Sequence, residues 1–180
     1  MSPDGIRLVV ILVLAGAALG WLLLAWIYRV TGTWERVLSS EEHEEGVRAE
    51  RITLGQFGPF VTGRRDVAGG YQQYSGMLLG PRLTLTRRDH GKASLMRMGF
   101  PDAVADKLEG EVMANLKLRV VDGGLFLDGA FEPLKVEFTH QPPRITGMVA
   151  QAPQRRRYRR VQPLEERVPA FEEQAEASEA

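Results

Sequence analysis

Hydrophobic and polar positions divide this chain into one continuous apolar run and a longer region of alternation. The run extends from Leu8 to Tyr28 without a charged residue. A helix needs about 20 apolar residues to cross a bilayer. Trp21, Trp26 and Tyr28 gather in its C-terminal half, where aromatic rings suit the headgroup boundary. The pattern predicts a single transmembrane anchor over residues 1–28.

A cleavable signal peptide is the alternative interpretation of this run. Its core would end near Ala15-Gly16-Ala17, a small-residue site of the kind that signal peptidases cleave. The apolar run continues well beyond that site, and cleavage would leave Leu and Trp exposed at the new terminus. A retained anchor is therefore favoured. The chain has no cysteine, which excludes a lipid-modified cysteine as the anchor.

Two glycines in the run suggest how the helix could associate. Gly16 and Gly20 match the small-xxx-small pattern that lets two membrane helices approach closely. A homodimer through these candidate helix-packing residues is one interpretation, and the other is that the pattern follows from composition alone, because it is frequent in membrane helices.

Basic residues near the run give its expected orientation. Arg29 and Arg36 follow it, whereas Arg7 precedes it and is offset by Asp4. Cytoplasmic flanks carry the excess of Lys and Arg. We expect the large C-terminal part on the cytoplasmic side, and the absence of cysteine fits a reducing compartment.

From residue 51 to about residue 163 the dominant period is two. Leu83 and Leu85 alternate with threonines, and the segment 112–120 alternates apolar with polar residues. Asp122-Gly123-Gly124 is a hairpin signal after that segment. Many short strands with Gly and Pro between them predict a mainly β domain, a small antiparallel β-barrel or sandwich.

Helices are expected at two places. Pro101 and Asp102 suit the start of a short helix over about 101–109, with Gly110 placed to end it. Ser39 and Glu42 have the spacing of a capping box, which indicates a short exposed helix in the segment 29–50.

Charge is balanced overall but arranged in blocks. There are 23 basic and 23 acidic residues, so no global field favours nucleic acid as a partner. Acidic residues concentrate in 29–50, interpreted as a juxtamembrane linker, and in 164–180, interpreted as a disordered tail.

The most distinctive basic stretch lies near the end of the β region. Several arginines in a row suit an anionic membrane surface or an acidic partner, and a tyrosine among them could stack on a base. The bland interpretation is a strand with arginines on its solvent face. The candidate interaction surface consists of Arg155, Arg156, Arg157, Tyr158, Arg159 and Arg160.

The sequence contains only weak signals for catalytic or metal-binding residues. Asp89 and His90 are adjacent and should point apart on a strand or turn, His140 precedes a double proline, and His43 lies in a solvated acidic segment. Gly69-Gly70 lacks the residues of a phosphate loop. The sequence predicts no catalytic residue, no cofactor and no metal.

The function predicted from these patterns is binding rather than catalysis. We expect a membrane-anchored adaptor or accessory subunit that holds a protein partner near the bilayer. A ligand- or lipid-binding barrel is the alternative, because Phe57, Phe60, Tyr71 and Tyr74 could line an apolar cavity. A hydrolase would require His90 or His140 in a cleft beside a carboxylate.

Overall fold

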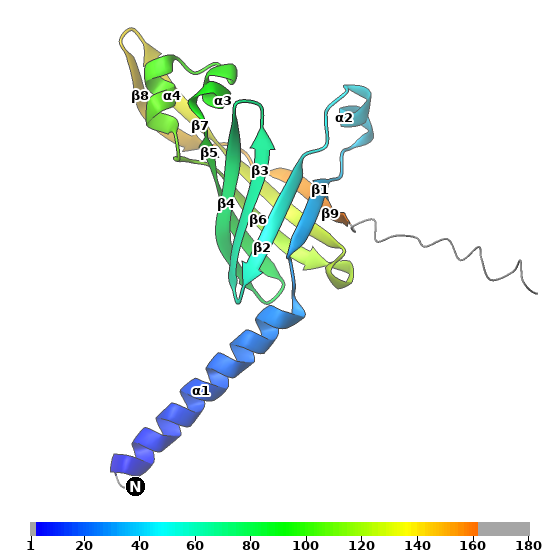
Figure 1. The fold of residues 1–180 in the computed structure, drawn as a ribbon, viewed down its shortest axis with the longest axis vertical. Helices are drawn as coiled ribbons and strands as arrows, with labels where there is room; N and C mark the ends of the chain where they lie inside the picture. The colour runs from blue at the N-terminus through cyan, green and yellow to red at the C-terminus, as the bar shows by residue number, and fades with distance from the viewer. Residues whose placement is uncertain (1–2, 162–180) are drawn as a thin grey trace, which may run out of the picture.

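The computed structural model describes residues 3–161 of the 180-residue chain, apart from the side chains at 3–5, 8, 17, 18 and 21–26. A long N-terminal helix leads into one end of a β-barrel, and short helices with a projecting β-ribbon lie at the other end (Figure 1). The helical elements are α1 (Pro3–Ile27), α2 (Ser40–Glu44), α3 (Lys92–Arg97), α4 (Asp102–Leu108) and the 3₁₀ turn η1 (Asp122–Gly124). The strands are β1 (Gly32–Arg36), β2 (Arg51–Phe57), β3 (Phe60–Val67), β4 (Gly70–Leu79), β5 (Arg82–His90), β6 (Val112–Val121), β7 (Phe126–His140), β8 (Pro143–Ala150) and β9 (Gln154–Val161).

The sheet closes on itself as an antiparallel barrel. Its strand order is β6-β5-β4-β3-β2-β1-β9-β7-β8, and a further pairing between β6 and β7 joins the two sides. Eight strands form the closed barrel, and β8 pairs only with the second half of β7. The prediction of a mainly β fold is confirmed, and the structure selects the barrel over the sandwich.

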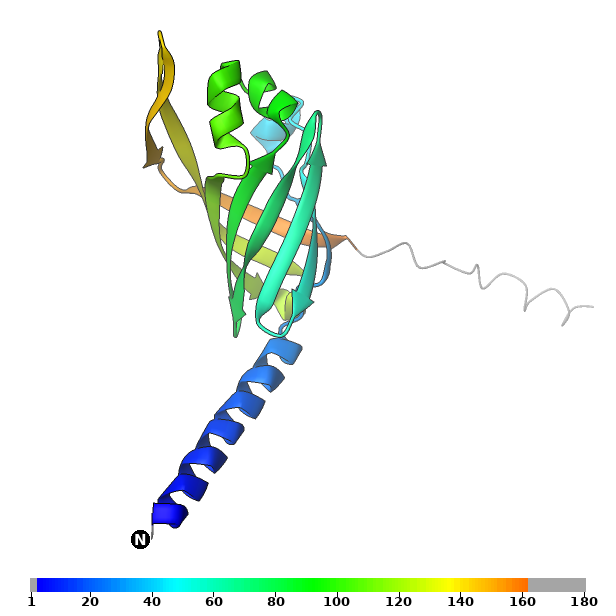
Figure 2. The ribbon, with the colours of Figure 1, turned by 60° about the vertical axis from the view of Figure 1, so that its left-hand side comes forward.

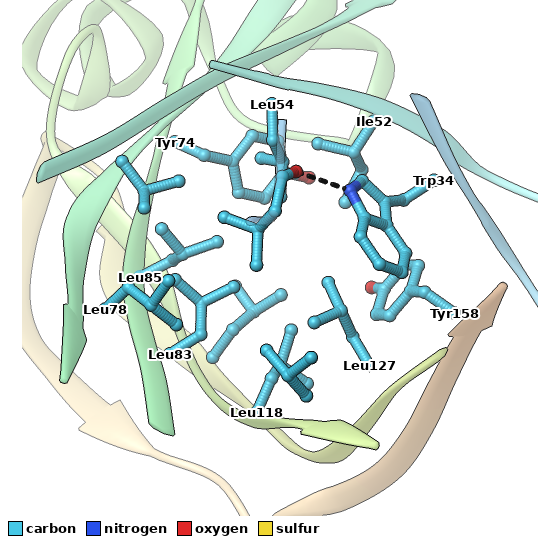
Figure 3. Close-up of a cluster of buried hydrophobic side chains, with 14 of the residues drawn as sticks. Trp34, Ile52, Leu54, Tyr74, Leu78, Leu83, Leu85, Leu118, Leu127 and Tyr158 are labelled. Carbon is cyan, nitrogen blue, oxygen red and sulfur yellow. Dashed lines mark hydrogen bonds between the residues drawn. The ribbon is translucent and has the colours of Figure 1, made fainter. Parts of the chain in front are cut away.

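Side chains that point inward from these strands fill the barrel (Figure 3). Trp34, Leu83 and Leu85 are at most 1% exposed. The indole Nε1 of Trp34 donates a hydrogen bond of 2.8 Å to the carbonyl of Val30, so the buried N–H has a partner. This contact also fixes the chain just before β1.

Two strand glycines allow the barrel wall to pack closely. A Cβ on Gly76 of β4 would lie 1.9 Å from the Thr84 carbonyl oxygen, and one on Gly129 of β7 would lie 2.1 Å from that of Lys117. Only glycine fits where two backbones approach so closely.

The barrel begins earlier than the sequence indicates. β1 lies inside the segment 29–50, which the charge pattern predicts to be a linker, and it pairs with both β2 and β9. The same segment contains α2, where Ser39 and Glu42 form the predicted capping box. This part of the chain therefore contributes a barrel strand as well as an exposed helix.

Two short helices cover the barrel end that lies opposite α1 (Figure 2). α4 confirms the helix predicted over about 101–109, whereas α3 was not expected. They meet β6 to β8 in a second apolar cluster that includes Leu95, Leu108 and Val136.

The apolar run of the sequence coincides with α1, which extends from Pro3 to Ile27. Among the described residues, no helix combines the length and apolar character that a bilayer crossing needs. The structure thus does not confirm the predicted transmembrane helix. The predicted acidic tail, 164–180, lies outside the described residues.

Candidate functional site

The basic run of β9 is divided between the two faces of the barrel wall. Side chains alternate along a strand, so Arg156, Tyr158 and Arg160 belong to the inner face. Arg155, Arg157 and Arg159 belong to the outer face. Tyr158 is only 1% exposed and is unavailable for stacking on a base. The six candidate residues therefore do not form one exposed surface.

Each outer arginine has a carboxylate partner. Arg155 pairs with Asp128 at 2.9 Å, Arg157 with Asp122 at 2.9 Å, and Arg159 with Glu35 at 2.6 Å. Hydrogen bonds from Arg155 hold the pKa of Asp128 below its usual value. Similarly, bonds from Arg159 and Arg51 lower the pKa of Glu35. Much of the positive charge on this strand face is thus neutralised within the fold.

On the inner face, Glu50 is the centre of a buried charged cluster. Its carboxylate accepts hydrogen bonds from the Tyr158 hydroxyl, from Nη1 of Arg156 at 2.8 Å and from Nη1 of Arg65 at 3.0 Å. The side chains of Glu50 and Arg156 are only 10% and 11% exposed. Strands β3 and β9 are thereby joined to the residue that precedes β2.

The cluster continues across β4 and β5. Nη1 of Arg65 donates to Oε1 of Gln72 at 3.2 Å, and Nε2 of Gln72 donates to Oδ2 of Asp89 at 3.3 Å. Nε of Arg87 lies 2.9 Å from Oδ1 of Asp89. Tyr74 also donates to Gln72. The result is one polar network, from Glu50 to Asp89, across the barrel interior.

Burial and charge shift the pKa values in this network. Burial raises the pKa of Glu50, but Tyr158, Arg156 and Arg65 outweigh it, so the pKa is lowered. Burial, reinforced by the Glu50 charge, raises the pKa of Tyr74 to about 12 and raises that of Tyr158 further. Glu50 is therefore held ionised and both tyrosines are held neutral at neutral pH.

Among the described residues, the side chains that point into the barrel pack against one another. Apolar side chains fill one part, and the ion-paired network fills the end near α3 and α4. Four pockets of about 410–610 Å³ are lined by the outer wall and the α2 segment, and one of about 340 Å³ lies at the barrel end beside α1, where Tyr28, Val120 and Arg160 line it. The largest of these lies over β6 and β7 and includes Lys117, Asp128 and Arg155.

The histidines do not assemble a catalytic or metal site in the described part of the chain. The His90 ring stacks on Tyr71 at 4.7 Å and bonds Gln73, whereas the neighbouring Asp89 points into the barrel. His140 packs edge-on against Phe138 at 5.0 Å. No cluster of three or more potential metal ligands occurs among the described residues.

Of the two predicted helix-packing residues, neither has a neighbour close to its Cβ position within the described structure. A Cβ on Gly16 or Gly20 would meet nothing within 4 Å. Their role in self-association stays a prediction.

A feature that the sequence analysis missed is the open edge of β8. This strand pairs with β7 on one side, and no strand of the described chain pairs with its other side. Ile145 packs into the second apolar cluster, whereas Met148 and Val149 are 37% and 51% exposed. The uncharged segment 145–150 after Pro142-Pro143 was the available signal, because natural edge strands usually carry charge.

Comparison with known proteins adds no family to this description. No protein-family model, no curated protein and no solved structure matches the chain.

Proposed function

We propose that this protein is a membrane-tethered adaptor, in which α1 holds the barrel at a bilayer and the barrel binds a protein partner. The observation that carries the binding part is the contrast between a filled barrel interior and the open edge of β8. An extended segment of a partner can add to such an edge through backbone hydrogen bonds. Binding rather than catalysis is the activity that these features support.

The tethering part is supported by the surface of α1. Its described apolar side chains from Val9 to Leu14 are 49–65% exposed, and Ile27 is 66% exposed. Soluble proteins rarely leave so continuous an apolar surface uncovered. A lipid environment would cover it, and the arginines after the run favour the cytoplasmic side for the barrel.

A matched pair of variants tests the edge. Met148→Lys places a charge beside the open edge of β8, whereas Met96→Lys places the same charge on the exposed surface of α3. The full-length protein would be extracted in detergent, and captured partners quantified by mass spectrometry. We expect Met148→Lys to lose a partner that wild type and Met96→Lys retain. Equal capture by all three would overturn the edge as the binding site.

Fractionation tests the tether separately. The full-length protein should resist extraction from membranes by alkaline carbonate and by high salt, and deletion of residues 1–28 should release the remainder. A reporter fused at Ala180 should be active only as a cytoplasmic fusion. Release of the intact protein by carbonate would overturn the tether.

A further inference from the structure

Exposed apolar side chains gather at the barrel end from which α1 projects. We call this group the apolar rim, and it consists of Phe57, Phe60, Met77, Leu79 and Leu125. Phe57 is 87% exposed and lies opposite Phe60 across the turn between β2 and β3. Phe60 in turn lies opposite Met77 of β4. Phe57, Phe60, Met77 and Leu79 lie next to one another at the ends of β2, β3 and β4, and Leu125 lies at the same end in the turn before β7.

The rim and α1 lie at the same end of the molecule (Figure 1). After α1 ends at Ile27, β1 begins at Gly32, which pairs with Leu54 of β2. Phe57 is the last residue of β2 and lies close to this point. Figure 2 shows the turns of this end beside the C-terminal end of α1. A surface that covers α1 could therefore reach the rim as well.

The connection between α1 and the barrel is held by several contacts. Val30 is fully buried, and its N–H donates to Oε1 of Gln56 at 2.9 Å. Nη2 of Arg160 donates to the carbonyls of Arg29 and Thr31 at 2.8 and 3.0 Å. Because the connection is anchored on both sides, the rim has a defined place relative to the end of α1.

Two exposed arginines lie at this end, where the exposed acid Asp122 is paired with Arg157. Arg82 follows Leu79 across the β4–β5 turn and lies opposite Arg119 of β6, and both arginines are exposed. Aromatic and aliphatic side chains flanked by arginine are typical of surfaces that bind at the membrane interface.

We propose that the apolar rim inserts into the interfacial layer of an anionic bilayer, so that the barrel rests on the membrane by the end that bears α1. This inference rests on the proposed tether for its geometry, but it concerns different residues and has a separate readout. The barrel then stands with α3, α4 and β8 directed away from the lipid.

The absence of cysteine from the chain allows a direct test. A polarity-sensitive fluorophore is attached to Phe57→Cys or Leu79→Cys in the full-length protein. Val149→Cys is the matched control, because Val149 is an exposed apolar residue at the opposite end. The protein is reconstituted in phosphatidylcholine–phosphatidylglycerol vesicles that contain lipid spin-labelled near the headgroup. Dyes at Phe57 and Leu79 should shift to the blue and be quenched by the lipid, while the dye at Val149 should not.

Two measurements separate the outcomes. Equal quenching at all three positions, or none at the rim, overturns the inference. Carbonate extraction of the same vesicles then shows whether α1 still holds the protein at the membrane when the rim does not insert.

Discussion

The hydroxyl of Tyr158 donates a hydrogen bond to the carboxylate of Glu50 inside the barrel, although the two residues are 108 positions apart in sequence. Arg156 and Arg65 complete the surroundings of the same carboxylate. The strand that the sequence marks as a basic surface is therefore also a structural element, tied by its inner face to the chain before β2.

Loss of the Glu50 charge should destabilise the barrel. Glu50→Gln keeps the size of the side chain but leaves Arg156 and Arg65 without their buried carboxylate. Breaking a buried ion pair costs about 3–5 kcal/mol, which should appear as a lower free energy of unfolding in denaturant. Glu132→Gln is the control, because Glu132 pairs with the exposed Lys117; it should cost at most about 1 kcal/mol. Equal losses in the two variants would contradict a central role for Glu50.

Acid should weaken the fold through the same carboxylate. The pKa of Glu50 is lowered in the folded state from its ordinary value of 4.5, so its stabilising contribution is fully present above pH 4.5. That contribution is lost as the pH falls from 4.5 through the lowered pKa. The Tm of the wild-type protein should therefore fall in this window, and more steeply than that of Glu50→Gln. Parallel curves of Tm against pH would show that other carboxylates account for the acid sensitivity.

Neighbouring arginines on β9 should differ sharply in their effect on stability. Arg156→Gln removes a buried partner of Glu50, and we expect a loss of about 3 kcal/mol. Arg157→Gln removes an exposed pair with Asp122, whose side chains are 43% and 56% exposed, and should cost under about 1 kcal/mol. Thermal unfolding of the two single variants measures the contrast. A larger loss for Arg157→Gln would contradict the assigned inner and outer faces.

Close packing of the barrel wall should make a side chain at Gly76 strongly destabilising. In Gly76→Ala the added methyl would collide with the backbone of Thr84, and such overpacking costs about 1–3 kcal/mol or more. The control is Gly55→Ala, where the nearest atom, Oγ1 of Thr62, is 3.8 Å away. It should change the free energy of unfolding by less than about 1 kcal/mol. Denaturant unfolding, or the yield of folded protein if Gly76→Ala does not fold, distinguishes the two.

The sequence correctly predicts those elements that depend on residues close together in the chain. Alternation in 112–120 became β6, Asp122-Gly123-Gly124 became the turn η1 before β7, and Ser39 with Glu42 formed their capping box. β1 was missed because it has only five residues and lies beside an acidic segment. Its place is determined by pairing with β2 and with β9, a contact between distant parts of the chain.

The buried charged cluster was less predictable than the fold, because it also depends on contacts between distant parts of the chain. Glu50 reads as one more acid of a solvated segment, and only the closed barrel brings it to Tyr158 and Arg156. The charge of the run from Arg155 to Arg160 is visible in the sequence, but which of its side chains face inward depends on the position of β9 in the barrel. The sequence suggests Phe57 and Phe60 as the lining of a cavity, but both side chains are exposed on either side of the turn between β2 and β3.

Closure of the barrel by β9 also sets an order of events during synthesis. β1 and β7 both need β9 as a neighbour, and the contact between Glu35 and Arg159 spans 124 residues. Until the chain up to Val161 has left the ribosome, both strands expose unpaired edges, which are prone to join other chains. Pairing over such separations is also slow. The nascent protein therefore passes through an open, aggregation-prone stage that ends only when its ninth strand arrives.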